Sequence, residues 1–450
     1  MLVVEAQAAR ISELEARLRA DSSTSSKPPS SDGLTKRPAK PRVKGLRAPG
    51  KQPGADGRYL SQVTEPDVVI EHEPHSCGSC GYSLVGAPLV QTETRQVADL
   101  PPMRLVWTEH RSCRRQCSCG HVTAGVFPQG VSAPAQYGPN MRAAATYLCS
   151  YQHVPYERAR QTFVDLLGAD VSVGWIVSSV GRLSGAVAPS VELIADQLAA
   201  GDLLHADETG CRVEGRLHWT HVASTDWYTH LSVHSRRGRI AMDEVGILPR
   251  FTGVAVHDGL TAYRGFDQCE HALCGAHHLR ELDGIAEHFE QPWAHEMAEL
   301  LREIKIFTDD ARARGASQIN ADDQRRFEHY YDELVSEGWF ANPPPPRTGG
   351  RGRPTLGRAG ALVHRLDRDR VEALRFMRDL AVPFDNNQAE RDVRPIKVRQ
   401  NISGSWRTRP GANDNARLRS YIDTARKQGH SIIAALRAAA EGCPWQPAPA

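Results

Sequence analysis

Three acidic residues stand in sequence contexts that suit metal-dependent chemistry on phosphodiester bonds. Asp207 ends the β-like run LLHAD, Asp258 ends the similar run GVAVHD, and Glu390 lies in the polar helical segment DNNQAERDVRP. Carboxylate oxygens are the hard ligands that Mg²⁺ and Mn²⁺ prefer. Two such ions can activate an attacking oxygen and stabilise the leaving one. The three acids are therefore candidate ligands of two catalytic ions.

Glu208 adjoins Asp207 and is an alternative ligand. Neighbouring residues on a strand point to opposite faces of a sheet, so only one of the two should reach a metal. We favour Asp207. Each acid alone is weak evidence, because most surface carboxylates only interact with solvent.

Five of the ten cysteines lie between residues 77 and 119, in CGSC and CSCGH. Four thiolates in two pairs suit one tetrahedral, structural Zn²⁺ ion, and we assign Cys77, Cys80, Cys117 and Cys119. Cys113 or His121 can replace one of these ligands. Unliganded thiols remain the alternative to a zinc site.

The elements before the acids form several predicted segments. Residues 1–20 predict a short coiled coil from Val4, Ile11 and Leu18, or an amphipathic helix docked on its own domain. Residues 21–60 predict a basic disordered arm, with nine basic and two acidic residues between 23 and 58. Residues 61–130 predict a zinc ribbon. Residues 138–190 predict a helix-turn-helix-like pair whose second helix runs from about Ser172 to Leu183.

The acids themselves fall in a predicted mixed sheet with covering helices. Between residues 200 and 275 three β-like runs precede a helix and a fourth strand. Residues 276–379 predict a helical insertion, residues 380–430 return to the sheet domain with Glu390, and residues 431–450 predict a final helix and tail. The expected fold class is multidomain α+β.

Composition excludes several classes of protein. The 450 residues exceed one ordinary core, and 40% hydrophobic with 24% charged residues is typical of globular chains. No apolar run approaches the roughly 18 residues of a membrane span. Charged residues such as Glu5 and Arg10 interrupt any signal-like apolar stretch, so we expect a cytoplasmic protein without a membrane partner.

These motifs together resemble the transposases of insertion sequence family sixty-six, members of the DDE group. The resemblance covers nearly the whole chain and is carried by SSTSSKPPSSD, the CGSC and CSCG pairs, HADETG, HDG, DNNQAERDVRPIKVRQ and SYIDTARKQGHSIIAALRA. DNNQAER with RPIK, and SYIDTARKQG, are the specific motifs. The sequence departs from the family pattern at Trp175 and Trp406, where Thr and Phe are expected.

The resemblance implies a ribonuclease-H-like core in which Asp207, Asp258 and Glu390 bind the catalytic ions. It also implies a DNA transposase that cleaves insertion-sequence ends and transfers strands into target DNA. The pair Cys274 and His277 in LCGAHH matches a motif after the second aspartate, although packed core residues are the alternative reading. Arg391 and Arg394 flank Glu390 as supporting residues.

A transposase must contact double-stranded DNA at the element ends and in the target. Two basic regions are expected to meet phosphates, which gives affinity and salt dependence but little base specificity. The candidate residues are Lys36, Arg37, Lys40, Arg42, Lys44, Arg47, Lys51, Lys397, Arg399, Arg407 and Arg409. Base contacts are expected from the zinc ribbon or the second helix of the pair.

Two element ends must be joined, so we expect a homodimer or higher oligomer; small accessory proteins of the same element are possible partners. Rival readings are a nuclease of the same core, a non-catalytic DNA-binding descendant and a zinc-dependent regulator. Product analysis separates the nuclease from the transposase, and the regulator leaves the acidic strand ends unexplained.

Overall fold

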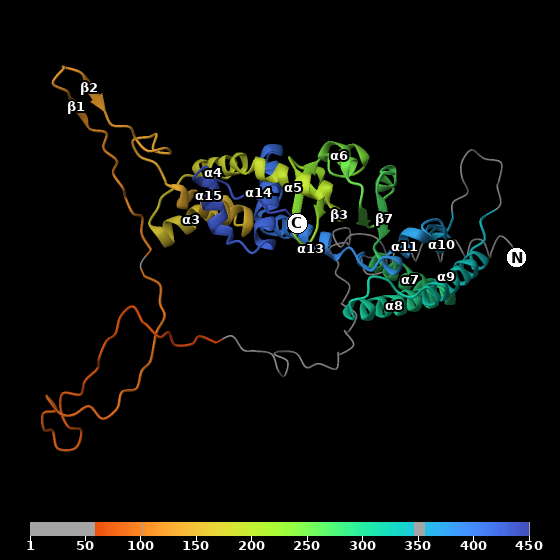
Figure 1. Cartoon of the computed structure of the whole chain (residues 1–450), viewed down its shortest axis with the longest axis horizontal. Helices are drawn as coiled ribbons and strands as arrows, with labels where there is room; N and C mark the ends of the chain where they lie inside the picture. The colour runs from red at the N-terminus through yellow and green to blue at the C-terminus, as the bar shows by residue number, and fades with distance from the viewer. Residues whose placement is uncertain (1–58, 102, 346–355, 450) are drawn as a thin grey trace. The chain divides into compact units, whose positions relative to one another are not determined.

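The computed structural model describes residues 59–101, 103–345 and 356–449 (Figure 1). The chain divides into two compact units, residues 36–106 and residues 1–35 with 107–450. The coiled coil predicted over 1–20 lies outside the described residues. So does nearly all of the basic arm predicted over 21–60, with its seven candidate phosphate-binding residues from Lys36 to Lys51.

The described part of the unit 36–106 contains no helix or strand. Its only pairing is an isolated antiparallel bridge between Ser76 and Ser83, around the turn that carries CGSC. In the other unit, β1 (Arg114–Gln116) and β2 (Val122–Ala124) form a hairpin around the turn that carries CSCGH. The ribbon fold predicted over 61–130 stays a prediction.

A five-stranded mixed sheet forms the centre of the larger unit. Its strands are β3 (Leu203–Val213), β4 (Arg216–Ser224), β5 (Thr229–His234), β6 (Val254–His257) and β7 (Glu270–Leu273). The spatial order is β5-β4-β3-β6-β7, with β3, β4 and β5 antiparallel and with β6 and β7 parallel to β3. The sheet and its many helices agree with the α+β class predicted from the sequence.

The sheet differs from the sequence prediction in two ways. We expected four strands, and the structure adds β7, whose sequence EHAL has two polar residues followed by two apolar ones and so lacks a period-two pattern. We also expected Asp207 to end its strand, but β3 continues to Val213 because β4 pairs with it from His205 to Val213. The antiparallel partner supplies backbone hydrogen bonds beyond the point where β6 ends.

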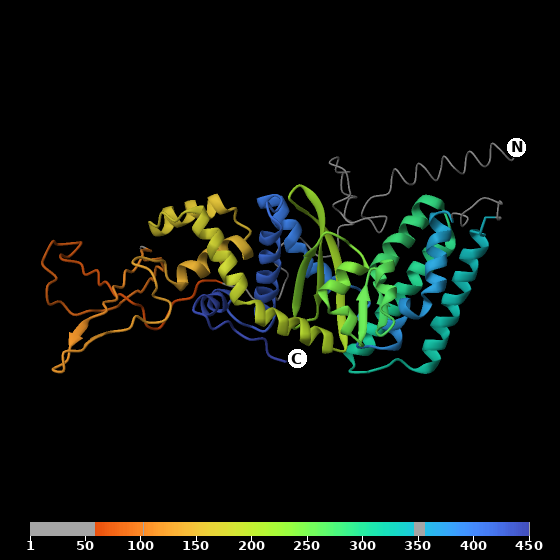
Figure 2. The same ribbon diagram turned by 90° about the horizontal axis from the view of Figure 1, so that it is seen from above.

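Helices surround this sheet (Figure 2). The helices that precede the sheet in the sequence are α2 (Pro139–Thr146), the π-helical turn η2 (Tyr147–Tyr151), α3 (Tyr156–Leu167), α4 (Val173–Ala186) and α5 (Ala188–Ala200). The helices that lie between its strands in the sequence are α6 (Arg239–Val245), η3 (Leu248–Arg250) and η4 (Thr261–Gly265). After it come α7 (Gly275–Phe289), α8 (Pro292–Ala313), α9 (Ala321–Ala341), α10 (Arg358–Arg368), α11 (Arg370–Ala373), α12 (Arg375–Arg378), α13 (Asn387–Ser403), α14 (Arg409–Lys427) and α15 (Ile432–Ala440).

Two apolar cores hold the larger unit together. One face of β3, β4 and β5 packs against α13 and α14, with Val213, Val222 and Leu231 meeting Val393 and Ala416. The second core joins β6 and β7 to helices α7 to α12, which form the segment predicted as a helical insertion. Figure 2 shows the sheet between these two sets of helices.

Side chains of α14 cover the outer edge of the sheet. Strand β5 is an edge strand, and its Thr229 and Leu231 N–H groups donate to Thr424 Oγ1 at 3.0 Å and Ser420 Oγ at 2.8 Å. Exposed edges otherwise leave backbone donors open to other chains. The buried pair of Lys427 Nζ and Asp392 Oδ2, at 2.6 Å, links α14 to α13. Helix α13 is therefore fixed to both β5 and α14.

The helix pair predicted over 138–190 corresponds to α3 and α4. Gly168 ends α3 in the left-handed conformation, with φ 61°, and the Ser172 hydroxyl caps α4 by accepting the Trp175 N–H. The Trp175 ring meets Tyr137 and Phe163 edge-on, so it packs between α3 and α4. A DNA-reading role for α4 stays a prediction. No helix among the described residues has the length and apolar character to cross a membrane.

Buried histidines make the stability of the larger unit depend on pH. His153 is 6% exposed, and burial, with help from Arg419 and Arg399, lowers its pKa to about 4. Unfolding returns its pKa to about 6.5, so its contribution is complete above pH 6.5 and is lost as pH falls toward 4.

We therefore expect His153→Asn to reduce the stability lost between pH 7 and pH 5 by about 2 kcal/mol. Asparagine also tolerates the φ of 60° at this position. Calorimetric unfolding at the two pH values measures the effect. The matched control is His329→Asn, at a histidine on α9 whose side chain is 77% exposed, and it should alter the loss of stability much less than His153→Asn does. An unchanged slope in His153→Asn would contradict the assignment.

Candidate active site

The strand register brings Asp207 and Asp258 to the same level of the sheet. The parallel pairing of β3 with β6 runs through His205 and Val256, and each aspartate lies two residues further along its own strand direction. β6 ends at His257, so Asp258 begins the loop that follows it. Asp258 Oδ1 accepts the Leu260 N–H at 2.9 Å, which fixes the carboxylate in this loop.

Alternation along β3 decides where the two neighbouring acids point. Cys211 and Val213 belong to the core that packs against α13, and Asp207 shares their parity and therefore their face. Glu208 points to the opposite face, where Tyr263 Oη donates to its Oε2 at 2.8 Å. Glu390 lies in the first turn of α13. The strand thus directs Asp207, rather than Glu208, toward the helix that carries Glu390.

The negative charges of these acids act on one another. The pKa of Asp207 is raised well above its ordinary value, first by burial and then by the charges of Glu208 and Asp258, with a smaller contribution from Glu390. Burial and Asp258 also raise the pKa of Glu208 to about 7, against the opposing effect of Arg237. A bound cation beside these carboxylates would favour their ionised forms.

Two arginines neutralise part of this charge. Arg280 of α7 places Nη2 3.3 Å from Glu390 Oε1. Arg237, between β5 and α6, places Nη2 3.5 Å from Asp258 Oδ2 and 2.7 Å from Glu208 Oε1. Asp258 and Glu390 therefore each contact one arginine side chain.

Asn386 connects the backbone segments that carry the acids. Its side-chain Nδ2 donates to Ala206 O at 2.8 Å, and its own carbonyl oxygen accepts the Glu390 N–H at 3.2 Å. Asn386 Oδ1 lies 2.8 Å from His205 Nδ1. Burial lowers the pKa of His205, so the neutral ring must donate from Nδ1 to this oxygen. Asn386 thereby ties the strand of Asp207 to the helix of Glu390.

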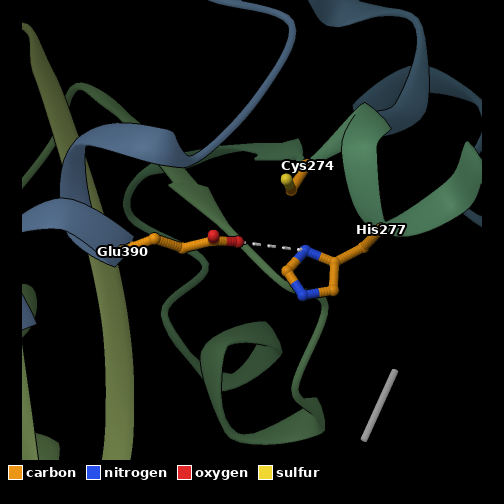
Figure 3. Close-up of side chains that lie close together, drawn as sticks. All are labelled: Cys274, His277 and Glu390. Carbon is orange, nitrogen blue, oxygen red and sulfur yellow. Dashed lines mark ion pairs between the residues drawn. The ribbon is translucent and has the colours of Figure 1, made fainter. Parts of the chain in front are cut away.

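Cys274, His277 and Glu390 form a second feature of this region (Figure 3). Each offers a ligand atom within 4.8 Å of the others, and His277 Nδ1 lies 4.0 Å from Glu390 Oε1. A thiol and an imidazole suit a softer ion than Mg²⁺. However, Cys274 Sγ already accepts the Asn386 N–H at 3.2 Å, and burial raises its pKa to about 11. These observations favour a packed, hydrogen-bonding thiol.

The residues predicted to support Glu390 lie elsewhere on α13. Arg391 is exposed and its Nη2 donates to Gln388 Oε1 at 2.7 Å, and Arg394 is exposed as well. Arg280 provides the cationic contact instead. Its position three residues after His277 on the same helix was the available signal, because residues at that spacing share a helix face.

The predicted phosphate-binding residues near the C-terminus fall into two groups. Lys397 is half-buried and donates to Gly210 O at 2.5 Å, and Arg399 stacks on the buried Trp406 ring at 4.1 Å. Both therefore stabilise the fold. The Trp406 backbone forms a bridge with Val213, and its buried ring lies in the same apolar core as Val213. Arg407 and Arg409 are exposed and open to a partner.

The two cysteine motifs form similar turns, each within its own unit. The Cys77 N–H donates to Tyr82 O at 2.8 Å, with Gly81 at a φ of 77°. The Cys117 N–H donates to His121 O at 2.8 Å, with Gly120 at a φ of 88°. Nearby backbone N–H groups lower the pKa of Cys77 and of Cys117. Cys77 is half-buried, whereas Cys80, Cys117 and Cys119 are exposed. The four-cysteine zinc site stays a prediction.

Comparison with family models identifies the family of the chain. A family profile described as Transposase IS66 family matches residues 134–414, which contain the whole sheet, the insertion and α13. The chain belongs to the Transposase IS66 family. Residues 2–60 match a family of unknown function, and no curated protein matches the chain.

Membership of the IS66 transposase family defines the activity in general terms. The protein is a nucleic-acid-processing enzyme of transposition, it binds DNA, and it uses a divalent metal. The resemblance noted from DNNQAERDVRPIKVRQ is thus confirmed.

The hydrogen bonds of the Asn386 side chain to Ala206 and His205 lead to a stability prediction. Asn386→Ala leaves Ala206 O and His205 Nδ1 unpaired in a buried setting, which we expect to lower the unfolding free energy by about 2–3 kcal/mol. The exposed neighbour Asn387 provides the matched control, Asn387→Ala, which should change stability little. Calorimetry compares the two variants. Equal unfolding free energies of the two variants would show that the Asn386 side chain does not stabilise the fold.

Proposed function

We propose that this IS66-family transposase cuts the ends of its insertion sequence and joins them to target DNA with two Mg²⁺ or Mn²⁺ ions. Asp207, Asp258 and Glu390 would hold these ions as a DDE triad. The observation that carries the proposal is geometric: the β3–β6 register brings Asp207 and Asp258 level, and Asn386 joins the strand of Asp207 to the first turn of the helix that carries Glu390. The charges of Asp258 and Glu390 both raise the pKa of Asp207, which supports this arrangement. Three acids distant in sequence act within one electrostatic neighbourhood.

The donor set fits such ions. Three carboxylates supply hard oxygen ligands, and the two arginines beside Asp258 and Glu390 mark positions where positive charge is stabilised. When bound, the ions supply Lewis-acid activation of the attacking oxygen and stabilisation of the leaving oxygen. The chain contributes fixed carboxylates, which the β3–β6 register and Asn386 hold in place.

The same site can perform both steps of transposition. Water attacks the phosphodiester bond in the first step and releases a DNA 3′-hydroxyl. That hydroxyl attacks a phosphodiester of the target in the second step, which forms one bond and breaks another with no external energy source. Both steps are in-line displacements at phosphorus, so one set of ligands serves both.

We further infer that the core is ribonuclease-H-like. The support is the order β5-β4-β3-β6-β7, with three antiparallel strands followed by two parallel ones and acids on β3 and directly after β6. A homodimer or larger assembly that pairs two element ends, with accessory proteins of the same element, belongs to the same proposal.

A structural Zn²⁺ ion on Cys77, Cys80, Cys117 and Cys119 is a separate proposal. It rests on the spacing of the pairs and on the similar glycine turn that each pair forms in its own unit.

The DDE assignment is tested by Asp258→Asn. We expect the variant to bind DNA that carries the native element ends but to lose cleavage and strand transfer by roughly a thousandfold or more, equal to about 4 kcal/mol of barrier. Gel assays with Mg²⁺ or Mn²⁺ and any accessory proteins measure both steps. The control is Asp267→Asn, an exposed aspartate in the loop before β7.

Two results would reject this function. Cleavage by Asp258→Asn at the wild-type rate would remove Asp258 from the triad. Wild-type protein that binds the ends but neither cuts nor joins them would instead be a DNA-binding remnant of a transposase.

Zinc is tested by metal content. Purified wild-type protein should contain one zinc per chain, and Cys80→Ser should lose it, because a structural site needs all four ligands. Cys443→Ser, at an exposed cysteine near the C-terminus, is the control. Atomic absorption that finds no zinc in the wild type would sink the proposal.

A further inference from the structure

Arg237 has an environment that the triad alone does not explain. It lies between β5 and α6, and its Nε and Nη2 both reach Glu208 Oε1, at 2.8 and 2.7 Å. Its guanidinium also lies over the Trp219 ring, 4.9 Å from the centroid. An arginine held by an acid on one side and an aromatic face on another has few alternative rotamers, so its position is set before any ligand arrives.

Neutralising Glu208 is one purpose of this arrangement. The Glu208 side chain has no exposed surface, and a buried carboxylate needs a charged or hydrogen-bonded partner. Arg237 serves one oxygen and Tyr263 the other, so Glu208 is fully paired. An arginine whose only role was to pair with Glu208 would need no further contact.

Arg237 extends beyond Glu208 toward solvent. Its side chain is 39% exposed, and Nη2 also lies 3.5 Å from Asp258 Oδ2. Nη1 has no hydrogen-bond partner among the residues that the structure describes. The guanidinium therefore links the buried Glu208 to the partly exposed Asp258, and its Nη1 donors remain available to a ligand.

We propose that Arg237 binds a phosphate group of the DNA strand at the cleavage position, on the solvent side of Asp258. This inference rests on the proposed function, which brings a phosphodiester to the triad. A guanidinium is suited to the task because its planar donors match phosphate oxygens, while a lysine would offer only a point charge. Glu208 then acts as a positioning residue, since it holds Arg237 without touching the DNA.

The test measures binding without catalysis. Full-length protein is titrated with an element-end duplex in Ca²⁺, an ion that carboxylates also bind, and no product formation is needed for the readout. Arg237→Gln should weaken binding about tenfold and reduce the slope of log affinity against log salt by about one phosphate contact. The control is Arg250→Gln, an arginine of similar exposure paired with Asp196, which should change neither quantity.

Neutral phosphates locate the contact. Methylphosphonate groups are placed one at a time at the phosphates around the cleavage position. At one of them the Arg237→Gln effect should fall to nearly nothing, because the charge that the arginine recognises is already absent. If the variant weakens binding equally at every position, or does not weaken it at all, Arg237 is not a phosphate-binding residue.

A second variant guards against misfolding. Arg237→Gln leaves Glu208 buried without its cation, so the double variant Glu208→Gln/Arg237→Gln removes both charges and keeps the net charge. It should match the wild type in thermal unfolding and still bind DNA about tenfold more weakly. A double variant with wild-type DNA affinity would overturn the proposal. If the wild type cuts element ends and Arg237→Gln binds DNA as well as the wild type does, only the inference about Arg237 is rejected. If the wild type does not cut element ends, the proposed function is rejected.

Discussion

The site depends on one constraint, the parallel pairing of β3 with β6. This pairing fixes Leu203, Leu204 and His205 opposite Val254, Ala255 and Val256, and so carries Asp207 and Asp258 to the same level. A shift of one residue in β3 would turn Asp207 to the face of Tyr263 and turn Glu208 toward α13. The identity of the acid that faces Glu390 is therefore a matter of register.

Further contacts hold α13 against the sheet in which this register is set. Its apolar residues Ala389, Val393 and Ile396 pack on the sheet, and Asp392 pairs with Lys427 of α14. Asn386 adds a polar connection to Ala206 at the start of the helix. Glu390 lies within this anchored first turn, so a residue far along the chain gains a fixed distance from β3.

The concentration of carboxylates has an energetic cost that the surrounding residues offset. Burial and the neighbouring acids raise the pKa values of Asp207 and Glu208, and Arg237, Arg280 and Tyr263 supply opposing contacts to the acids of the site. Such a site is poorly suited to stability alone, because burying like charges together disfavours their ionised forms. Strained electrostatics of this kind are typical of functional sites.

The sequence by itself determined the family and the order of sheet, helices and returning helix, because these follow from local patterns and from specific motifs such as DNNQAERDVRPIKVRQ. It also predicted the three acids as metal ligands, which stays a prediction. It did not predict β7, the continuation of β3 past Asp207, or the contacts of Lys397 with Gly210 and of Arg399 with Trp406. Those depend on partners distant in the chain: β4 extends β3, and Gly210 and Trp406 engage the two cations. Arg237, Arg280 and Asn386 were also found only in three dimensions. Local sequence records which side chains are present, whereas only tertiary packing decides which charges and hydrogen-bonding groups meet.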